Sequence, residues 1–375
     1  MADRTGWHLE EDELLAAASE STGGLTDLGG SRVWGRFCLL VRLAESGGVP
    51  AIARSNDPRA EARRVLVLLL EGRLRFVADE FRYPGIEAEH IERPLIVTGI
   101  AGAGTEMLHT LLAADPGNRA PRYWELRPSS PPPCVSGPNR ERVEEATRRL
   151  RSLEGFFAAG GMTLADCDWI WKTDAYLSGF IGGSDSDRYA FHRRFLQHLQ
   201  FGGPRRRWVL RGTSHYRHVS ALWETYPDAV VVWVHRDPAE ATRHAATSQS
   251  AYEAAKLGHD DVSSEDTVTL AVRMLDVVSA HLSRALCDPG LDRVHHVGYT
   301  DLVAEPTRTL RGIYEHAGIE FGEATRSALR NAARPPGVRS PSSDFPLPAG
   351  RNRDVLTEYS RRFGIVAGVR MDLRP

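Results

Sequence analysis

Lysine, cysteine and long apolar runs are scarce in this 375-residue sequence. Of its 47 basic residues, only Lys172 and Lys256 are lysines, a composition typical of genes from GC-rich bacteria. The basic residues nearly balance the 49 acidic ones, so no global field favours nucleic acid or a membrane surface as a partner. We therefore expect any anion-binding site to be local.

The few cysteines lie far apart, without the paired spacing of a zinc site or a disulfide framework. They are Cys38, Cys134, Cys167 and Cys287. No stretch approaches the roughly 20 apolar residues of a membrane span, and the first residues lack the pattern of a signal peptide. We expect a cytoplasmic protein that uses no metal and is neither secreted nor anchored.

The order of the apolar runs predicts an α/β fold, with a parallel sheet flanked by helices. A short β-branched run at 95–100 indicates the first strand. Three further buried strands are expected at 208–212, 229–236 and 293–299. Because a helical pattern follows each run, the strands should pair in parallel with helices on both faces of the sheet.

Helical periodicity before residue 93, clearest over 60–81, predicts an amino-terminal helical extension or cap. We therefore divide the chain into this extension, 1–93, and an α/β domain, 94–375. The domain should contain a helical insertion at about 140–200 and a carboxyl-terminal tail or lid at 333–375. A proline-rich stretch at 127–139, RPSSPPPCVSGPN, lies inside the α/β domain before the insertion and predicts a loop without helix or central strand.

A glycine-rich turn follows the first strand. Gly99, Gly102 and Gly104 lead into a helical pattern that begins at Thr105. A strand, a glycine turn and a helix start present backbone N–H groups and the positive end of a helix dipole to an anion. The glycine spacing is that of a P-loop. No Lys-Ser or Lys-Thr follows, however, which excludes the P-loop motif of nucleoside triphosphatases. For this segment alone, a plain tight turn remains an alternative.

Four separated segments carry motifs in a fixed order. They are the loop with Gly99, Gly104, Thr105 and Leu108, followed by LLAADPGNRAPRYWE (111–125); WVLRGTSH (208–215); YPDA (226–229) with HRDP (235–238); and YTDL (299–302) with Pro306. Together these segments resemble a bacterial branch of the sulfotransferase family. The resemblance covers nearly the whole chain and implies the P-loop-like, three-layer sulfotransferase fold.

The resemblance implies a binding site for the family's donor, 3'-phosphoadenosine 5'-phosphosulfate (PAPS). The loop backbone and Thr105 would hold the 5'-phosphate, Arg236 would pair with the 3'-phosphate, and Tyr299 would lie near the adenine. His244 replaces a family serine and could contact the 3'-phosphate when protonated. Two structural alternatives stay open: an ion pair of Arg236 with a neighbouring acid, and a core position for Tyr299.

Sulfuryl transfer needs a base and a cation around an in-line displacement. His215 matches the family's histidine and is the candidate base, although a helix-start histidine without a catalytic role is an alternative. Arg211 stands where the family has lysine and can neutralise charge but cannot give up its proton. Glu106 replaces a threonine or serine. Its carboxylate is either held away from the donor by Arg211 or is itself a working group.

Departures from the family loop leave three functions open. Ala101, Gly102 and Ala103 replace Pro-Arg-Ser/Thr, which removes a cation and a hydroxyl. The first function is sulfuryl transfer from PAPS to a hydroxyl or amine of a small metabolite, with secondary metabolism as one setting. The second is a rebuilt site in which Glu106 and His215 catalyse elimination, cyclisation or another transfer. The third is binding without catalysis.

The expected partner is a small-molecule acceptor, with neither nucleic acid nor membrane. The oligomeric state stays open, and a homodimer is one option. We expect the acceptor pocket to be built from the amino-terminal helices and the variable region 169–189, which mixes aromatic residues with glycines.

Overall fold

The computed structural model describes residues 6–49, 52, 56–126, 130–136, 140–144, 184–257, 264–331, 345, 347 and 353–365. These residues fall into two compact units. The first unit takes its described residues from 1–91, 123–144 and 168–205, and the second takes those of 92–122 and 206–375.

The first unit is helical. Its elements are α1 (Glu11–Ser21), α2 (Ser31–Glu45), α4 (Pro58–Arg82), η1 (Ile86–Ala88), α6 (Tyr123–Leu126), α7 (Pro133–Ser136) and α11 (Asp185–Gln200). The helix predicted over 60–81 is confirmed by α4, which begins where Asp57 Oδ1 accepts a hydrogen bond from Ala60 N at 3.0 Å. Apolar side chains of α1, α2 and α4, such as Leu14, Phe37 and Leu70, form one buried core.

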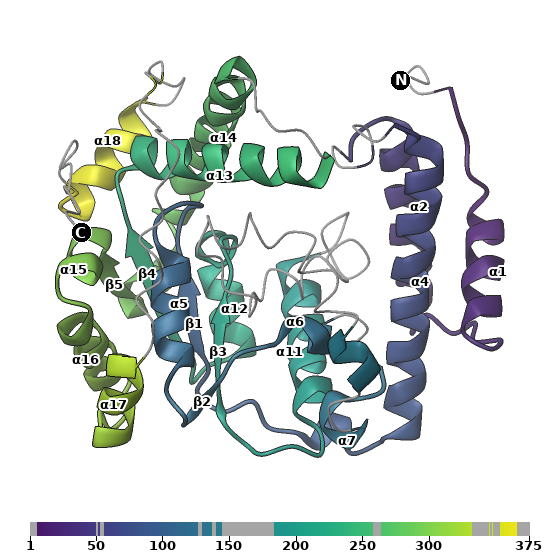
Figure 1. Ribbon diagram of the computed structural model, residues 1–375, viewed down its shortest axis with the longest axis horizontal. Helices are drawn as coiled ribbons and strands as arrows, with labels where there is room; N and C mark the ends of the chain where they lie inside the picture. Colours follow the sequence, from purple (N-terminus) through teal and green to yellow (C-terminus); the bar gives the residue numbers. More distant parts are fainter. Residues whose placement is uncertain are drawn as a thin grey trace. The chain divides into compact units, whose positions relative to one another are not determined.

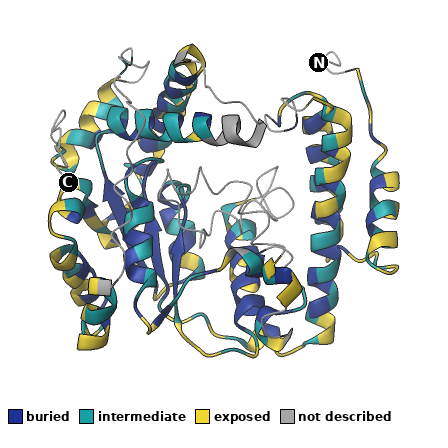
Figure 2. Cartoon of the chain, viewed as in Figure 1, coloured by how far each residue is buried: buried dark blue, intermediate teal, exposed yellow. Residues whose placement is uncertain are grey.

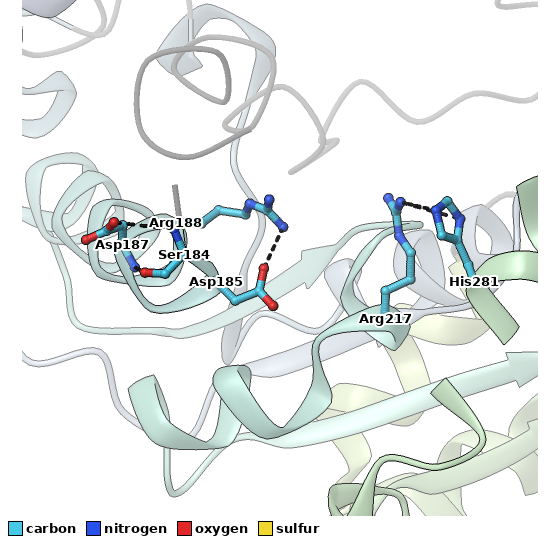
Figure 3. A network of polar contacts seen from close by, with 6 residues as sticks. All are labelled: Ser184, Asp185, Asp187, Arg188, Arg217 and His281. Carbon is cyan, nitrogen blue, oxygen red and sulfur yellow. Dashed lines mark hydrogen bonds and ion pairs between the residues drawn. The ribbon is translucent and has the colours of Figure 1, made fainter. Parts of the chain in front are cut away.

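Helix α11 starts at a capping box, in which Asp187 N donates to Ser184 Oγ at 3.1 Å and Ser184 N donates back to the Asp187 carboxylate (Figure 3). It packs on α4 through the stacked rings of Phe76 and Phe195, whose centroids are 5.9 Å apart. Beside them, His198 Nε2 lies 3.0 Å from Asp79 Oδ2.

The prediction of a helix-free proline-rich stretch is wrong at one point. Residues Pro133–Ser136 form the single helical turn α7. Proline is tolerated there because it occupies the first helical position, where no helical N–H bond is lost.

The second unit is built on the predicted parallel sheet (Figure 1). Its strands are β1 (Leu95–Thr98), β2 (Asn118–Arg119), β3 (Arg207–Arg211), β4 (Val230–His235) and β5 (His295–Gly298), in the order β2-β3-β1-β4-β5. Every neighbouring pair is parallel, and Leu95 aligns with both Val209 and Val230. Strands β1 and β4 are buried along their whole length (Figure 2), as expected for central strands with covered faces.

Helices cover both faces of this sheet. They are α5 (Thr105–Ala113), α12 (Val219–Thr225), α13 (Pro238–Leu257), α14 (Ser264–Ala285), α15 (Tyr299–Ala304), α16 (Pro306–His316), α17 (Glu323–Asn331) and α18 (Arg353–Arg362), with the 3-10 turns η2 (His215–Arg217) and η3 (Pro289–Arg293). Leu112 and Ile313 join the core on one face. On the other, Trp233 contacts the rings of Tyr216 and Tyr359. The four strand positions predicted from sequence are confirmed, whereas the two-residue β2 was not predicted.

Two expected regions lie mostly outside the described residues. The helical insertion is described only at 140–144 and 184–200, which leaves out 169–183 of the expected acceptor region. Most of the tail 333–352 is likewise outside. Among the described helices, none has the length and apolar character needed to cross a bilayer.

Candidate active site

The glycine loop lies at the carboxyl end of β1 and needs glycine at two positions. Gly102 and Gly104 have left-handed φ values of 83° and 94°. A Cβ on Gly102 would collide with the carbonyl oxygen of Ala241 in α13. A Cβ on Gly104 would overlap the ring of Tyr299, whose Cε2 would be 2.7 Å away. The loop therefore packs directly against α13 and the start of α15.

Helix α5 opens immediately after this loop, at Thr105. Its N-cap is Gly104, which has no side chain to accept hydrogen bonds from the first turn. The first-turn N–H groups and the helix dipole together favour an anion at this place. Thr105 itself is buried.

A buried hydroxyl links the loop to the turn that follows β3. Thr98 Oγ1 donates to Gly212 O at 2.8 Å and accepts from Tyr216 N at 3.0 Å. Gly212 N donates to Val97 O at 3.1 Å. Thr98 was not among the predicted site residues, although a lone hydroxyl in a fully buried apolar strand is a usable signal.

Arg236 follows β4 and joins the loop to Tyr299. Its Nη1 donates to Gly102 O at 2.9 Å, and its guanidinium lies over the Tyr299 ring, 4.4 Å from the centroid. The Nε atom also lies 3.7 Å from Glu240 Oε2, so the ion pair with a neighbouring acid, left open above, is present as well. We call Arg236, Tyr299 and Gly102 the clamp end of the site. A carbonyl and an aromatic ring are neutral, so of these three contacts Glu240 is the one that compensates the charge of Arg236.

His244 lies on α13 near Arg236 and is half-buried. Burial, assisted by the positive charge of Arg236, lowers the pKa of His244 to about 4. The side chain is therefore neutral near pH 7. In that state it offers a hydrogen bond rather than the second positive charge considered from the sequence.

Arg211, Glu106 and His215 form what we call the reaction end. Arg211 ends β3 and is 7% exposed, and its Nη1 lies 3.5 Å from Glu106 Oε1 in the first turn of α5. Glu106 is 25% exposed. His215 begins η2, four residues beyond Arg211, and is 0% exposed. An acceptor reaches its ring only if surrounding side chains shift. The ion pair is compatible with the alternative in which Arg211 restrains the Glu106 carboxylate, and it does not distinguish this from a working Glu106.

Both ends sit at one edge because β1, β3, β4 and β5 are parallel. Their carboxyl ends carry, in turn, the glycine loop, the turn with His215, Arg236 and Tyr299. Open α/β sheets bind ligands at this edge. Among the described residues, no three histidine, cysteine or carboxylate side chains gather where they could hold a metal ion.

A pocket of about 290 Å³ borders the same edge. It is lined by Ala101 of the loop, by Thr213, Tyr216 and Arg217 after β3, and by one face of α14. Sequence analysis did not identify this face or Arg217. Nothing in the local pattern distinguishes Arg217 from a surface arginine, because only the fold brings α14 beside η2.

Comparison with known proteins agrees with this architecture. No curated protein sequence matches the chain. Sulfotransferase STF9 from Mycobacterium avium is similar in structure, with a TM-score of 0.71 and 21% identity over 97% of this chain and 99% of that one. Sulfotransferase STF1 from Mycobacterium tuberculosis H37Rv has a TM-score of 0.63 and 24% identity over 95% and 98%. At these identities the two structures show the shared fold.

The family is shown by a separate match. The model of the sulfotransferase family matches residues 94–323, more than half of the chain and all of the motifs described above. The chain therefore belongs to the sulfotransferase family and is an enzyme of sulfuryl transfer.

Proposed function

We propose that this sulfotransferase takes its sulfuryl group from PAPS and passes it to a hydroxyl or amine of a small metabolite. The observation that carries the proposal is the clamp end, where Arg236 bonds to the loop at Gly102 and lies over Tyr299. A helix-start loop and an arginine at one edge suit a donor with anionic groups at two ends.

The residues at the helix start fit an anionic donor. Gly104 leaves the first-turn N–H groups without a side-chain cap. Glu106 is the residue of that turn that opposes an anion, and Arg211 offsets its charge at 3.5 Å. When bound, the donor supplies the activated sulfuryl group.

The chain's own groups would then divide the work. The loop N–H groups hold the 5'-phosphate, and Arg236 binds the 3'-phosphate. His215 accepts the proton of the acceptor hydroxyl while the acceptor oxygen forms its bond to sulfur and the bond from sulfur to the 5'-phosphate oxygen breaks. The 5'-phosphate leaves with the bonding electrons. Arg211 neutralises charge on the transferring group and keeps its own proton.

The product nucleotide provides the direct test. We expect adenosine 3',5'-bisphosphate to raise the melting temperature, because a ligand at about 100 times its dissociation constant adds about 2.7 kcal/mol of stability. The 2',5' isomer should stabilise less, since its second phosphate is displaced from Arg236. Loss of one charged hydrogen bond in Arg236→Gln should weaken the 3',5' isomer about 10- to 100-fold.

Arg308→Gln is the matched control, because Arg308 is an exposed arginine of α16 that pairs only locally with Glu305. It should leave nucleotide affinity unchanged. Absence of any stabilisation by millimolar adenosine 3',5'-bisphosphate would overturn the choice of PAPS as donor. Equal affinity for both isomers would overturn the role of Arg236 at the 3'-phosphate.

A further inference from the structure

The pocket of about 290 Å³ lies on the side of the glycine loop marked by Ala101. Its size is close to the lower limit of about 300 Å³ for small-molecule sites, so it suits a compact ligand. The rest of the wall comes from the turn after β3 and from α14, both within the second unit. The pocket therefore borders both the expected donor loop and the turn that carries His215.

One wall of the pocket is apolar. Val277 and Val278 lie three and four residues after Met274 on α14, so both share one face of the helix with Met274. Val277 is 53% exposed, which is high for a large apolar side chain on a packed helix. Tyr216 also lines the pocket, and burial raises the pKa of its phenol to about 12, so it is uncharged at neutral pH. These groups fit an apolar ligand body.

The opposite character comes from two arginines, Arg217 and Arg273, that line the same pocket. Arg217 Nη1 lies 3.2 Å from Nε2 of His281, which is also a lining residue (Figure 3). Burial, together with the charge of Arg217, lowers the pKa of His281 to about 4, so this partner is neutral near pH 7. The contact therefore leaves the charge of Arg217 uncompensated.

Two further observations point to an anion beside Arg217. Its Nε is buried and has no hydrogen-bond partner among the described residues. The described lining residues include no aspartate or glutamate. A guanidinium carries five N–H donors in a planar fork that matches a carboxylate. An apolar wall with an uncompensated arginine is the arrangement expected for an apolar molecule that bears one anionic group.

We propose that this pocket is the acceptor subsite and that it selects a small hydroxylated apolar molecule carrying a carboxylate, which Arg217 binds. The inference rests on the proposed sulfuryl transfer. With its carboxylate at Arg217 and its apolar body on α14, the acceptor presents its hydroxyl toward the loop at Ala101. The hydroxyl oxygen forms the new bond to sulfur, its proton passes to His215, and the bond from sulfur to the 5'-phosphate oxygen breaks.

A matched pair of phenols tests the selection. We would titrate 4-hydroxyphenylpropanoate and 4-propylphenol, which differ in the carboxylate, into the full chain with and without saturating adenosine 3',5'-bisphosphate. The carboxylate probe should bind at least about tenfold more tightly, as expected for one charge-assisted hydrogen-bond pair. The ratio of the two kcat/KM values with PAPS as donor should show the same preference.

Arg217→Gln should abolish the preference by weakening the carboxylate probe, with little change for 4-propylphenol and none for the nucleotide. Arg284→Gln removes the same charge from the exposed side of α14, outside the pocket lining, and should keep the preference. A melting curve and nucleotide titration of Arg217→Gln establish that the variant is folded.

Equal binding of the two phenols, no binding of either, or a preference that survives in Arg217→Gln would each overturn the inference. Failure of the donor proposal is separately visible, because the nucleotide is titrated first. If the nucleotide does not bind, the titrations without nucleotide still decide whether the pocket prefers the carboxylate.

Discussion

Arg211 is the last residue of β3, and Arg236 directly follows β4. These two strands flank β1, yet the surroundings of the two arginines differ. Arg211 is 7% exposed and lies against the carboxylate of Glu106. Arg236 is 20% exposed and is held by the Gly102 carbonyl and the Tyr299 ring, with Glu240 at 3.7 Å. Each arginine thus has a carboxylate neighbour, at 3.5 Å and 3.7 Å, and Arg236 differs in its greater exposure and in its two further contacts to neutral groups, which compensate none of its charge.

This difference separates two tasks. The clamp end carries the more exposed of the two arginines and should control nucleotide affinity. The reaction end combines a compensated arginine with a buried histidine and should control turnover. Substitution of His215 should therefore change kcat with little effect on nucleotide binding, in contrast to Arg236→Gln.

The largest expected effect is that of His215→Ala on turnover. Loss of a general base should lower kcat by about 10²- to 10⁴-fold, with nucleotide affinity unchanged. Because His215 is fully buried, His215→Asn, which leaves a smaller gap, serves as a second variant. Parallel losses of melting temperature and kcat in both variants would mark His215 as structural. They would contradict the proposal that the reaction end controls turnover while the clamp end controls nucleotide affinity.

Thr98→Val should cost stability at the link between the loop and the β3 turn. The substitution leaves Gly212 O and Tyr216 N buried without their hydroxyl partner. Each unsatisfied group should lower the free energy of unfolding by about 1–3 kcal/mol, which urea unfolding can measure. Thr98→Ser keeps the hydroxyl and is the control. If the valine variant were as stable as the serine variant, the hydroxyl link would have no role in holding the reaction end.

Glu106→Thr distinguishes a restrained carboxylate from a working one. In the sulfotransferase with a restrained Glu106, removing this charge from beside the donor should strengthen nucleotide binding, by about fivefold for roughly 1 kcal/mol of repulsion. Turnover should be kept or increased. In a rebuilt site the same variant should abolish the native reaction.

Glu106→Gln provides the isosteric control, because it removes the charge and retains the shape. It should strengthen nucleotide binding as the threonine variant does. Unchanged affinity and turnover in both variants would mean that Glu106 neither opposes the donor nor takes part in the reaction, and that Arg211 compensates no charge relevant to the site.

Acid should weaken the fold through neutral, half-buried histidines such as His244, beside the clamp end. Its folded pKa of about 4 lies below the ordinary value of about 6.5 in an unfolded chain. The unfolded state therefore binds a proton first as the pH falls. The stability from this histidine is complete above about pH 6.5 and declines toward pH 4, by at most about 1.4 kcal/mol per pH unit.

Urea unfolding at pH 7, 6 and 5 should give a shallower decline for His244→Gln than for the unsubstituted protein. His8→Gln removes a histidine that is 64% exposed and should leave the decline unchanged. Equal slopes for His244→Gln and the unsubstituted protein would contradict a neutral, half-buried His244.

Much of the site was predictable from sequence because local patterns specify strands, turns and helix starts. The apolar runs that precede Gly99, the His215 turn, Asp237 and Thr300 predicted four strand ends, and parallel pairing places such ends at one edge. The β2 strand was not predictable, since two residues carry no periodicity. The helical turn α7 was missed because proline excludes helix interiors but not helix starts.

The sequence by itself determined the fold class, the order of the strands along the chain and the residue types available to an anion. Tertiary structure alone decided the long-range contacts of these charges. Arg236 meets the carbonyl of Gly102 across 134 positions of sequence, and α13 packs so closely that Gly102 has no room for a Cβ. Such pairings depend on strand register and helix packing, which bring together residues whose local patterns carry no information about each other.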